Sequence, residues 1–157
     1  LNYEVNMTHS MTETGINMNQ KFTPLECDDD VILLEKDSFM VSRLKELIEE
    51  EIRNKLQQHI YEYTSLYPGV SMLEFLSKLS IGQKKINLKE IQHNYITECQ
   101  LLKVGAHGWQ KGKLKIQIST SSVTPYQNKL YLEFSSDEPT EHDFILDEIC
   151  KIVQSDK

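Results

Sequence analysis

A row of lysines beside the chain's only tryptophan is the feature of this sequence with the clearest potential for chemistry. Lysines alternate with apolar residues from Lys111 to Ile118. Because side chains of a β-strand alternate between its two faces, the ammonium groups share one face and the apolar groups share the other. A loop that contains Gly105, Gly108 and Gly112 leads into this strand. The candidate residues for binding a partner are Lys103, His107, Trp109, Lys111, Lys113 and Lys115.

Two kinds of partner fit these residues. A nucleic acid or other polyanion would bind the ammonium groups through its phosphates and stack a base on Trp109, Tyr126 or Tyr131. The formal net charge of −7, however, makes long-range attraction of a polyanion weak. An acidic protein surface meets the same charges, and a single tryptophan ringed by charge is typical of an interface anchor. A third interpretation stays open, in which the lysines are solvated and only hinder aggregation.

No pattern indicates catalysis, a cofactor or a metal site. The spacing of the three glycines matches neither the Gly-x-x-x-x-Gly-Lys-Ser/Thr phosphate loop nor the dinucleotide-binding Gly-x-Gly-x-x-Gly motif. We expect them to serve turns at positive φ, with a β-bulge at Lys111-Gly112-Lys113. Asp28-Asp29-Asp30 lacks the ligand spacing of a calcium loop. The sequence therefore predicts a non-catalytic interaction or regulatory module, not an enzyme, with an unidentified protein partner and with nucleic-acid binding as the alternative.

The three cysteines, Cys27, Cys99 and Cys150, are far apart in the sequence. An odd number without close spacing does not suggest a disulfide framework, so we expect a reducing environment, with Cys99 and Cys150 as small core residues. No apolar run approaches the roughly 20 residues that span a bilayer. The first residues do not resemble a secretory signal. The sequence thus favours a cytoplasmic protein without a membrane partner.

Hydrophobic periodicity predicts the elements that hold the lysine strand. Residues 1–29 are polar and aperiodic, which predicts a flexible N-terminal tail before a single domain at residues 30–155. Val31–Leu34 fits a short buried strand. Asp37 or Ser38 can cap a helix, and apolar residues then recur at helical spacing from Leu44 to Tyr63, which predicts one helix of about seven turns.

The remaining elements are shorter. We expect a second helix after Ser71, one or two helical turns at residues 87–90 and a C-terminal helix capped by Thr140. The expected strands are residues 95–104, 113–120 and 129–134. These elements predict an α+β fold, in which a small antiparallel sheet of three or four strands packs against a long N-terminal helix and a C-terminal helix. The long helix exceeds what this sheet can cover, which predicts a homodimer.

The residues from Leu101 to Ile116, with Trp109-Gln-Lys-Gly-Lys113 at their centre, resemble the KGK domain, a small cyanobacterial module named after its Lys-Gly-Lys tripeptide. Flanking segments from about Asp30 to Val153 are also similar to that family. One departure is Ser135-Ser136, where the family pattern has Cys-Pro. The resemblance implies no assigned biochemical activity and supplies no catalytic residues.

Overall fold

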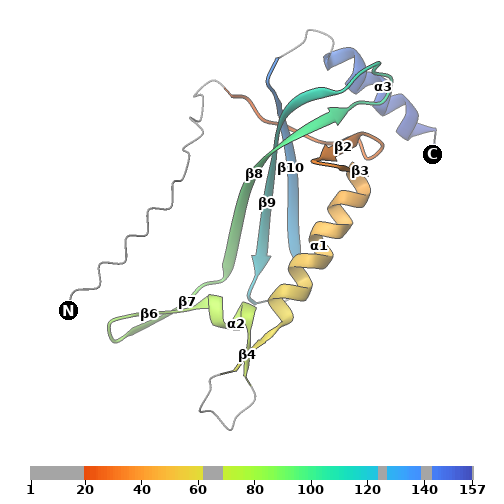
Figure 1. Ribbon diagram of the computed structural model, residues 1–157. Helices are drawn as coiled ribbons and strands as arrows, with labels where there is room; N and C mark the ends of the chain where they lie inside the picture. Colours follow the sequence, from red (N-terminus) through yellow and green to blue (C-terminus); the bar gives the residue numbers. More distant parts are fainter. Residues whose placement is uncertain (1–19, 62–68, 124–126, 139–142, 157) are drawn as a thin grey trace.

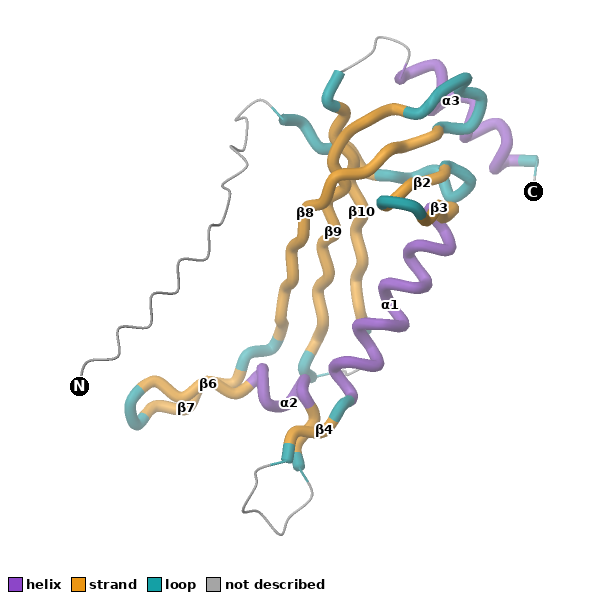
Figure 2. Tube along the Cα trace, viewed as in Figure 1, coloured by secondary structure: helices purple, strands orange, loops and turns teal. Residues whose placement is uncertain are grey.

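The computed structural model describes residues 20–61, 69–123, 127–138 and 143–156, and shows a mostly β protein (Figure 1). Three long antiparallel strands run through the centre, and one helix lies along them (Figure 2). The strands are β1 (Thr23–Pro24), β2 (Val31–Leu34), β3 (Asp37–Met40), β4 (His59–Ile60), β5 (Val70–Ser71), β6 (Lys78–Ile81), β7 (Lys84–Asn87), β8 (Glu90–Leu102), β9 (Gln110–Ser121) and β10 (Asn128–Ser136). The helices are α1 (Val41–Gln57), α2 (Met72–Ser77) and α3 (Asp143–Ser155).

The main sheet has six strands in the order β1-β10-β9-β8-β2-β3, and every neighbouring pair is antiparallel. The expected meander of β8, β9 and β10 is confirmed. The predicted α+β fold with a three- or four-stranded sheet is wrong, because β2 and β3 extend the sheet beside the end of β8, and β1 extends it beside β10. Two further two-stranded sheets, β4–β5 and β6–β7, complete the β structure of the described residues.

The predicted long N-terminal helix is also wrong. Residues Asp37–Met40 form strand β3, and α1 has 17 residues. Phe39 lies opposite Ile32 in the β2–β3 hairpin, so its apolar side chain is used in a sheet rather than in a first helical turn. At the other end, Gln58 has an extended backbone with φ −61° and ψ 141°, and the next two residues pair with β5.

The length of α1 changes the expectation about dimers. A helix of 17 residues is about 26 Å long, whereas the 12 residues of β9 span about 40 Å. The helix is therefore shorter than the sheet that it covers, and the argument for a homodimer from surplus helix is lost. Association of two copies remains a prediction without that support.

The core lies between α1 and one face of the sheet. The apolar positions of β9 point into it: Leu114 is 0% exposed and Ile118 is 5% exposed. The main cluster of buried residues comprises Leu25, Ile32, Val41, Leu44, Cys99, Leu101, Leu114, Leu132 and Phe134. Burying a side chain of this size stabilises a fold by about 1.5–3 kcal/mol, so the inward face of β9 is what fixes the outward direction of its lysines.

The segment between α1 and β8 forms the end of the molecule away from α3 (Figure 1). Ser71 caps α2 by accepting a hydrogen bond of 3.2 Å from the backbone N–H of Glu74, as the sequence predicts. The helical turns expected at residues 87–90 are wrong, because β7 pairs with β6 in a hairpin. Gly82, at φ 60°, supplies the positive φ that this tight turn requires.

Residues 20–29, which the sequence places in the N-terminal tail, take part in the fold. β1 pairs with β10, and the next residue, Leu25, is buried at 7% exposure and donates its N–H to the carbonyl of Leu132 at 2.8 Å. Residues 1–19 lie outside the described part of the chain. Among the described helices, none has the length and apolar character needed to cross a bilayer.

Candidate functional site

A pocket of about 540 Å³ lies where the β8–β9 connection, the ends of β9 and β10, and α3 meet. Its lining combines apolar surface with charges of both signs. The lining residues are Leu101, Lys103, Ala106, Gly108, Trp109, Gln110, Lys111, Ser136, Asp137, Glu138 and Leu146. Figure 2 shows the β8–β9 connection beside α3 at this end of the molecule.

The structure brings three of the six sequence-predicted residues to the pocket. Lys103, Trp109 and Lys111 line it, and Trp109 is 43% exposed. His107 is exposed in the same loop but does not line the pocket. The indole is therefore accessible to a partner in a lining that also contains lysines and apolar side chains.

The other two lysines lie further along β9, on a face of mixed charge. Lys113 is opposite Glu98 on β8, and Lys115 is opposite Glu133 on β10. Residues opposite one another in antiparallel strands share a face. Lys115 Nζ is 3.2 Å from Glu133 Oε2 and 5.7 Å from the centre of the ring of Phe22. This part of the lysine row is thus balanced by carboxylates instead of forming a continuous cationic track.

Tyr131, one of the two tyrosines named with the tryptophan, does not line the pocket. Tyr131 is 53% exposed and pairs with Gln117 in the sheet, two positions beyond Lys115. Tyr126 lies outside the described residues.

Gly112 fits its position because there is no space for a side chain. A Cβ there would overlap the ring of Phe134 and the carbonyl oxygen of Ser135. Pairing is continuous on both sides, with Cys99 and with Ser136, so the β-bulge predicted at this glycine is wrong. Of the three loop glycines, Gly105 has positive φ, at 82°, and serves a turn.

Hydrogen bonds hold the rim of the pocket in place. Gln110 Nε2 donates to Ser136 Oγ at 2.9 Å, and Ser136 Oγ donates to the carbonyl of Glu138 at 2.8 Å. The N–H of Asp137 donates to the carbonyl of Lys111 at 3.0 Å. The Ser136 hydroxyl thus bridges the start of β9 to the residues that follow β10.

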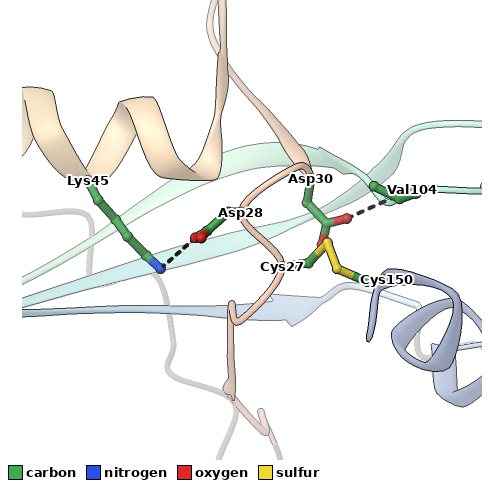
Figure 3. Close-up of a disulfide and its surroundings, with 6 residues drawn as sticks. All are labelled: Cys27, Asp28, Asp30, Lys45, Val104 and Cys150. Carbon is green, nitrogen blue, oxygen red and sulfur yellow. Dashed lines mark hydrogen bonds and ion pairs between the residues drawn. A yellow bond between two sulfur atoms is a disulfide. The ribbon is translucent and has the colours of Figure 1, made fainter. Parts of the chain in front are cut away.

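Asp30 anchors the start of the β8–β9 connection, next to the end of β8. Its side chain is 4% exposed, and Oδ1 accepts a hydrogen bond of 2.9 Å from the N–H of Val104 (Figure 3). Its carbonyl accepts another, of 2.8 Å, from Val41 at the start of α1. The acidic run that ends at Asp30 thus has a structural role that no local motif reveals, because its acceptor capacity is used by residues far away in the sequence.

A disulfide joins Cys27 to Cys150, with Cα atoms 6.0 Å apart (Figure 3). The predicted lack of disulfides is wrong, and so is the prediction that Cys150 is an unpaired core residue. The sequence separation of 123 leaves no spacing signal for this pair. The argument from cysteines for a reducing environment is lost, and a cytoplasmic location remains only a prediction.

Cys99 is free and buried, as the sequence predicts. Burial, and to a lesser degree the Asp137 carboxylate, raises the pKa of its thiol to about 12. A thiol of this kind stays protonated at neutral pH and is a poor nucleophile. Among the described residues, no group of three or more His, Cys, Asp or Glu side chains is arranged to hold a metal ion.

The pocket lining contains two lysines, Lys103 and Lys111, and two acids, Asp137 and Glu138. The sequence predicts the lysine contributions but not the acidic ones, because the acids come from the far end of β10. Leu146, from α3, is a further lining residue that only the folded chain brings here. The pocket is therefore suited to an apolar group with polar atoms around it.

The family relationship follows from the extent of a sequence match. The family model described as KGK domain matches residues 20–153. Comparison with curated proteins gave no significant match, and comparison with solved structures gave none either. The matched range covers most of the chain, from β1 into α3, and includes the Lys111-Gly112-Lys113 tripeptide beside the pocket. The chain belongs to the KGK domain family.

Proposed function

We propose that this KGK domain is a non-catalytic interaction module that binds a segment of a protein partner in the pocket beside Trp109. The observation that carries the proposal is the indole itself, which is 43% exposed in the wall of a hollow of about 540 Å³. Tryptophan is enriched among the few residues that supply most of the binding energy at protein interfaces.

The lining of the pocket indicates the chemistry of the bound segment. Leu101, Ala106 and Leu146 offer apolar contact beside the indole. Lys111 and Asp137, which are neighbours in the lining, favour charges of both signs around an apolar anchor. A short peptide segment with one large apolar side chain, flanked by an acid and a base, meets these requirements.

The distribution of charge favours a protein over a nucleic acid. A polyanion track needs successive unneutralised cations, but Lys115 is paired with Glu133, and Lys113 lies opposite Glu98. Nucleic-acid binding along this lysine strand is therefore the alternative outcome of the test below.

Selection of a random peptide library on the immobilised chain tests the proposal. Selected peptides should bind the wild type, and Trp109→Ala should weaken their binding about 30-fold, the equivalent of ~2 kcal/mol at an interface hot spot. Lys111→Glu should weaken it by a smaller factor. Lys84→Glu, in the β6–β7 hairpin, is the matched control for a charge reversal away from the pocket and should have no effect.

Two results would contradict the proposal. One is a set of peptides whose affinity is the same for the wild type and for folded Trp109→Ala. The other is tight binding of a single-stranded DNA probe that weakens steeply with added salt, since that dependence is characteristic of phosphate contacts.

A further inference from the structure

We propose that the Cys27–Cys150 disulfide is a redox modification site, at which a dithiol reductant releases α3 from the pocket. The consequence for partner binding rests on the function proposed above, but the release of α3 does not. Three features of the structure carry the proposal: the small buried surface of α3, the separate anchoring of Cys27 and the contribution of α3 to the pocket.

Among the α3 contacts that the structure describes, the disulfide is the main attachment. Among the α3 side chains that the structure describes, only Cys150 is buried. Leu146 and Ile149 lie against Gly105, whereas Ile145 and Ile152 are each 62% exposed. Burial of so little apolar surface gives a helix low resistance to local opening.

The segment around Cys27 is held independently of the disulfide. The carbonyl of Cys27 accepts a hydrogen bond of 3.2 Å from the N–H of Asp30, and the carbonyl of Asp28 accepts one of 3.2 Å from the N–H of Ser42. Asp28 also pairs with Lys45 at 3.4 Å (Figure 3). Cleavage of the disulfide therefore leaves the Cys27 turn attached to the start of α1 and frees the other partner, α3.

Release of α3 alters the candidate site directly. Leu146 is part of the pocket lining together with Trp109. Gly105, on which Leu146 and Ile149 lie, belongs to the same β8–β9 connection as Trp109. Reduction removes one wall of the pocket and exposes the indole further.

The chemistry is thiol–disulfide exchange with a dithiol. One thiolate of the reductant attacks a sulfur of the pair and displaces the other cysteine as a thiolate, which takes up a proton. The second thiol of the reductant then attacks the mixed disulfide and frees the remaining cysteine. The reductant leaves as a disulfide, so two electrons and two protons pass to Cys27 and Cys150. Because these residues are 7% and 5% exposed, attack requires the local opening of α3.

Cys99 does not compete in this exchange. It is 7% exposed, and its thiol remains protonated at neutral pH. Reduction should thus produce two new reactive thiols, at Cys27 and Cys150, and leave Cys99 unreactive in the folded chain.

The test uses the single tryptophan as a reporter. The folded full-length chain is treated with dithiothreitol, alkylated and mapped by mass spectrometry, and quenching of Trp109 fluorescence by acrylamide is measured in parallel. Cys27 and Cys150 should be alkylated only after reduction. The quenching constant should rise about twofold, as the indole passes from 43% exposure towards full exposure. Reoxidation should restore the original value.

A matched pair of variants separates the disulfide from the free thiol. Cys27→Ser combined with Cys150→Ser should show the high quenching constant without reductant, and Cys99→Ala should respond to dithiothreitol as the wild type does. If the double variant does not fold, reduction and reoxidation of the wild type still decide the question.

The proposal is overturned if native reduction leaves the quenching constant unchanged, or if the disulfide resists dithiothreitol until the whole chain unfolds. Redox-independent binding of selected peptides, with Trp109 still required, would remove the control of binding while leaving the proposed function intact. A change in quenching without any peptide binding would support the release of α3 and contradict the proposed function.

Discussion

The aromatic ring of Phe134 occupies the space that a side chain at Gly112 would need. The two residues come from neighbouring strands, with Phe134 opposite Leu114 on β9, and Phe134 itself is 4% exposed. The glycine of the Lys111-Gly112-Lys113 tripeptide is therefore explained by packing beneath the sheet.

Gly112→Ala should destabilise the chain by about 2–3 kcal/mol, the cost of overpacking a filled core. The methyl group would meet a backbone oxygen as well as the ring, so a side-chain rotation alone cannot relieve the overlap. Chemical denaturation measures the change in the free energy of unfolding. Gly108→Ala is the control, because a Cβ there meets nothing within 4 Å. Equal stability of the two variants would refute this explanation.

Asp30→Ala should lower the free energy of unfolding by about 2 kcal/mol, because it removes the buried carboxylate that accepts the hydrogen bond from the part-buried N–H of Val104. The comparison is Asp28→Ala, which removes an exposed ion pair with Lys45. Pairs of that kind contribute about 0–1 kcal/mol. Urea denaturation of both variants checks the difference, and a larger loss for Asp28→Ala would show that the buried acid is not the anchor.

Loss of the disulfide should lower the free energy of unfolding by about 2–4 kcal/mol, since the bond closes a long loop in the unfolded chain. The measurement is guanidinium denaturation of the wild type against Cys27→Ser combined with Cys150→Ser. In the double variant, the rate of hydrogen exchange should increase most at the backbone amides of α3 and little at those of β9. Uniform acceleration across the sheet would mean that α3 is not a separable unit.

The stability of the chain should contain a component from Cys99 that is lost at high pH. The folded-state pKa is raised from 9.0 to about 12, so the folded chain holds this proton more tightly than the unfolded chain does. The contribution is fully present below pH 9 and declines as the pH rises from 9 towards 12. Comparison of the wild type with Cys99→Ala across this range isolates the contribution from that of lysines and tyrosines. Parallel pH profiles would contradict the assignment.

Prediction from sequence succeeded where a pattern was local and continuous. The two-residue alternation from Lys111 to Ile118 survives as strand β9, because one face of that strand is needed for the core. The same reasoning failed at both ends of α1. The predicted helix includes Phe39 after its cap and Ile60 in its apolar stripe, but both residues pair in sheets, with Ile32 and Val70.

At the candidate site, too, the sequence predicts the residues that are close together in the chain but not those that come from distant segments. Lys103, Trp109 and Lys111 lie within one segment and could be grouped from the sequence alone. The acids on the rim and Leu146 reach the pocket only through the pairing of β10 with β9 and through the attachment of α3. The sequence does not reveal the disulfide partner of Cys27 either, because the sequence separation of two cysteines does not indicate whether they lie close together in the fold.

The Lys111-Gly112-Lys113 tripeptide lies in strand β9, where successive residues face opposite sides of the sheet, so each of the three contacts different neighbours. Lys111 lines the pocket, Gly112 leaves space for the ring of Phe134, and Lys113 pairs with Glu98 on one side and Ser135 on the other. Grafting these three residues onto an unrelated strand would therefore reproduce neither the pocket nor the packing, unless the graft included an equivalent of Phe134. The tripeptide depends on the neighbouring strands of this sheet and is not a binding motif by itself.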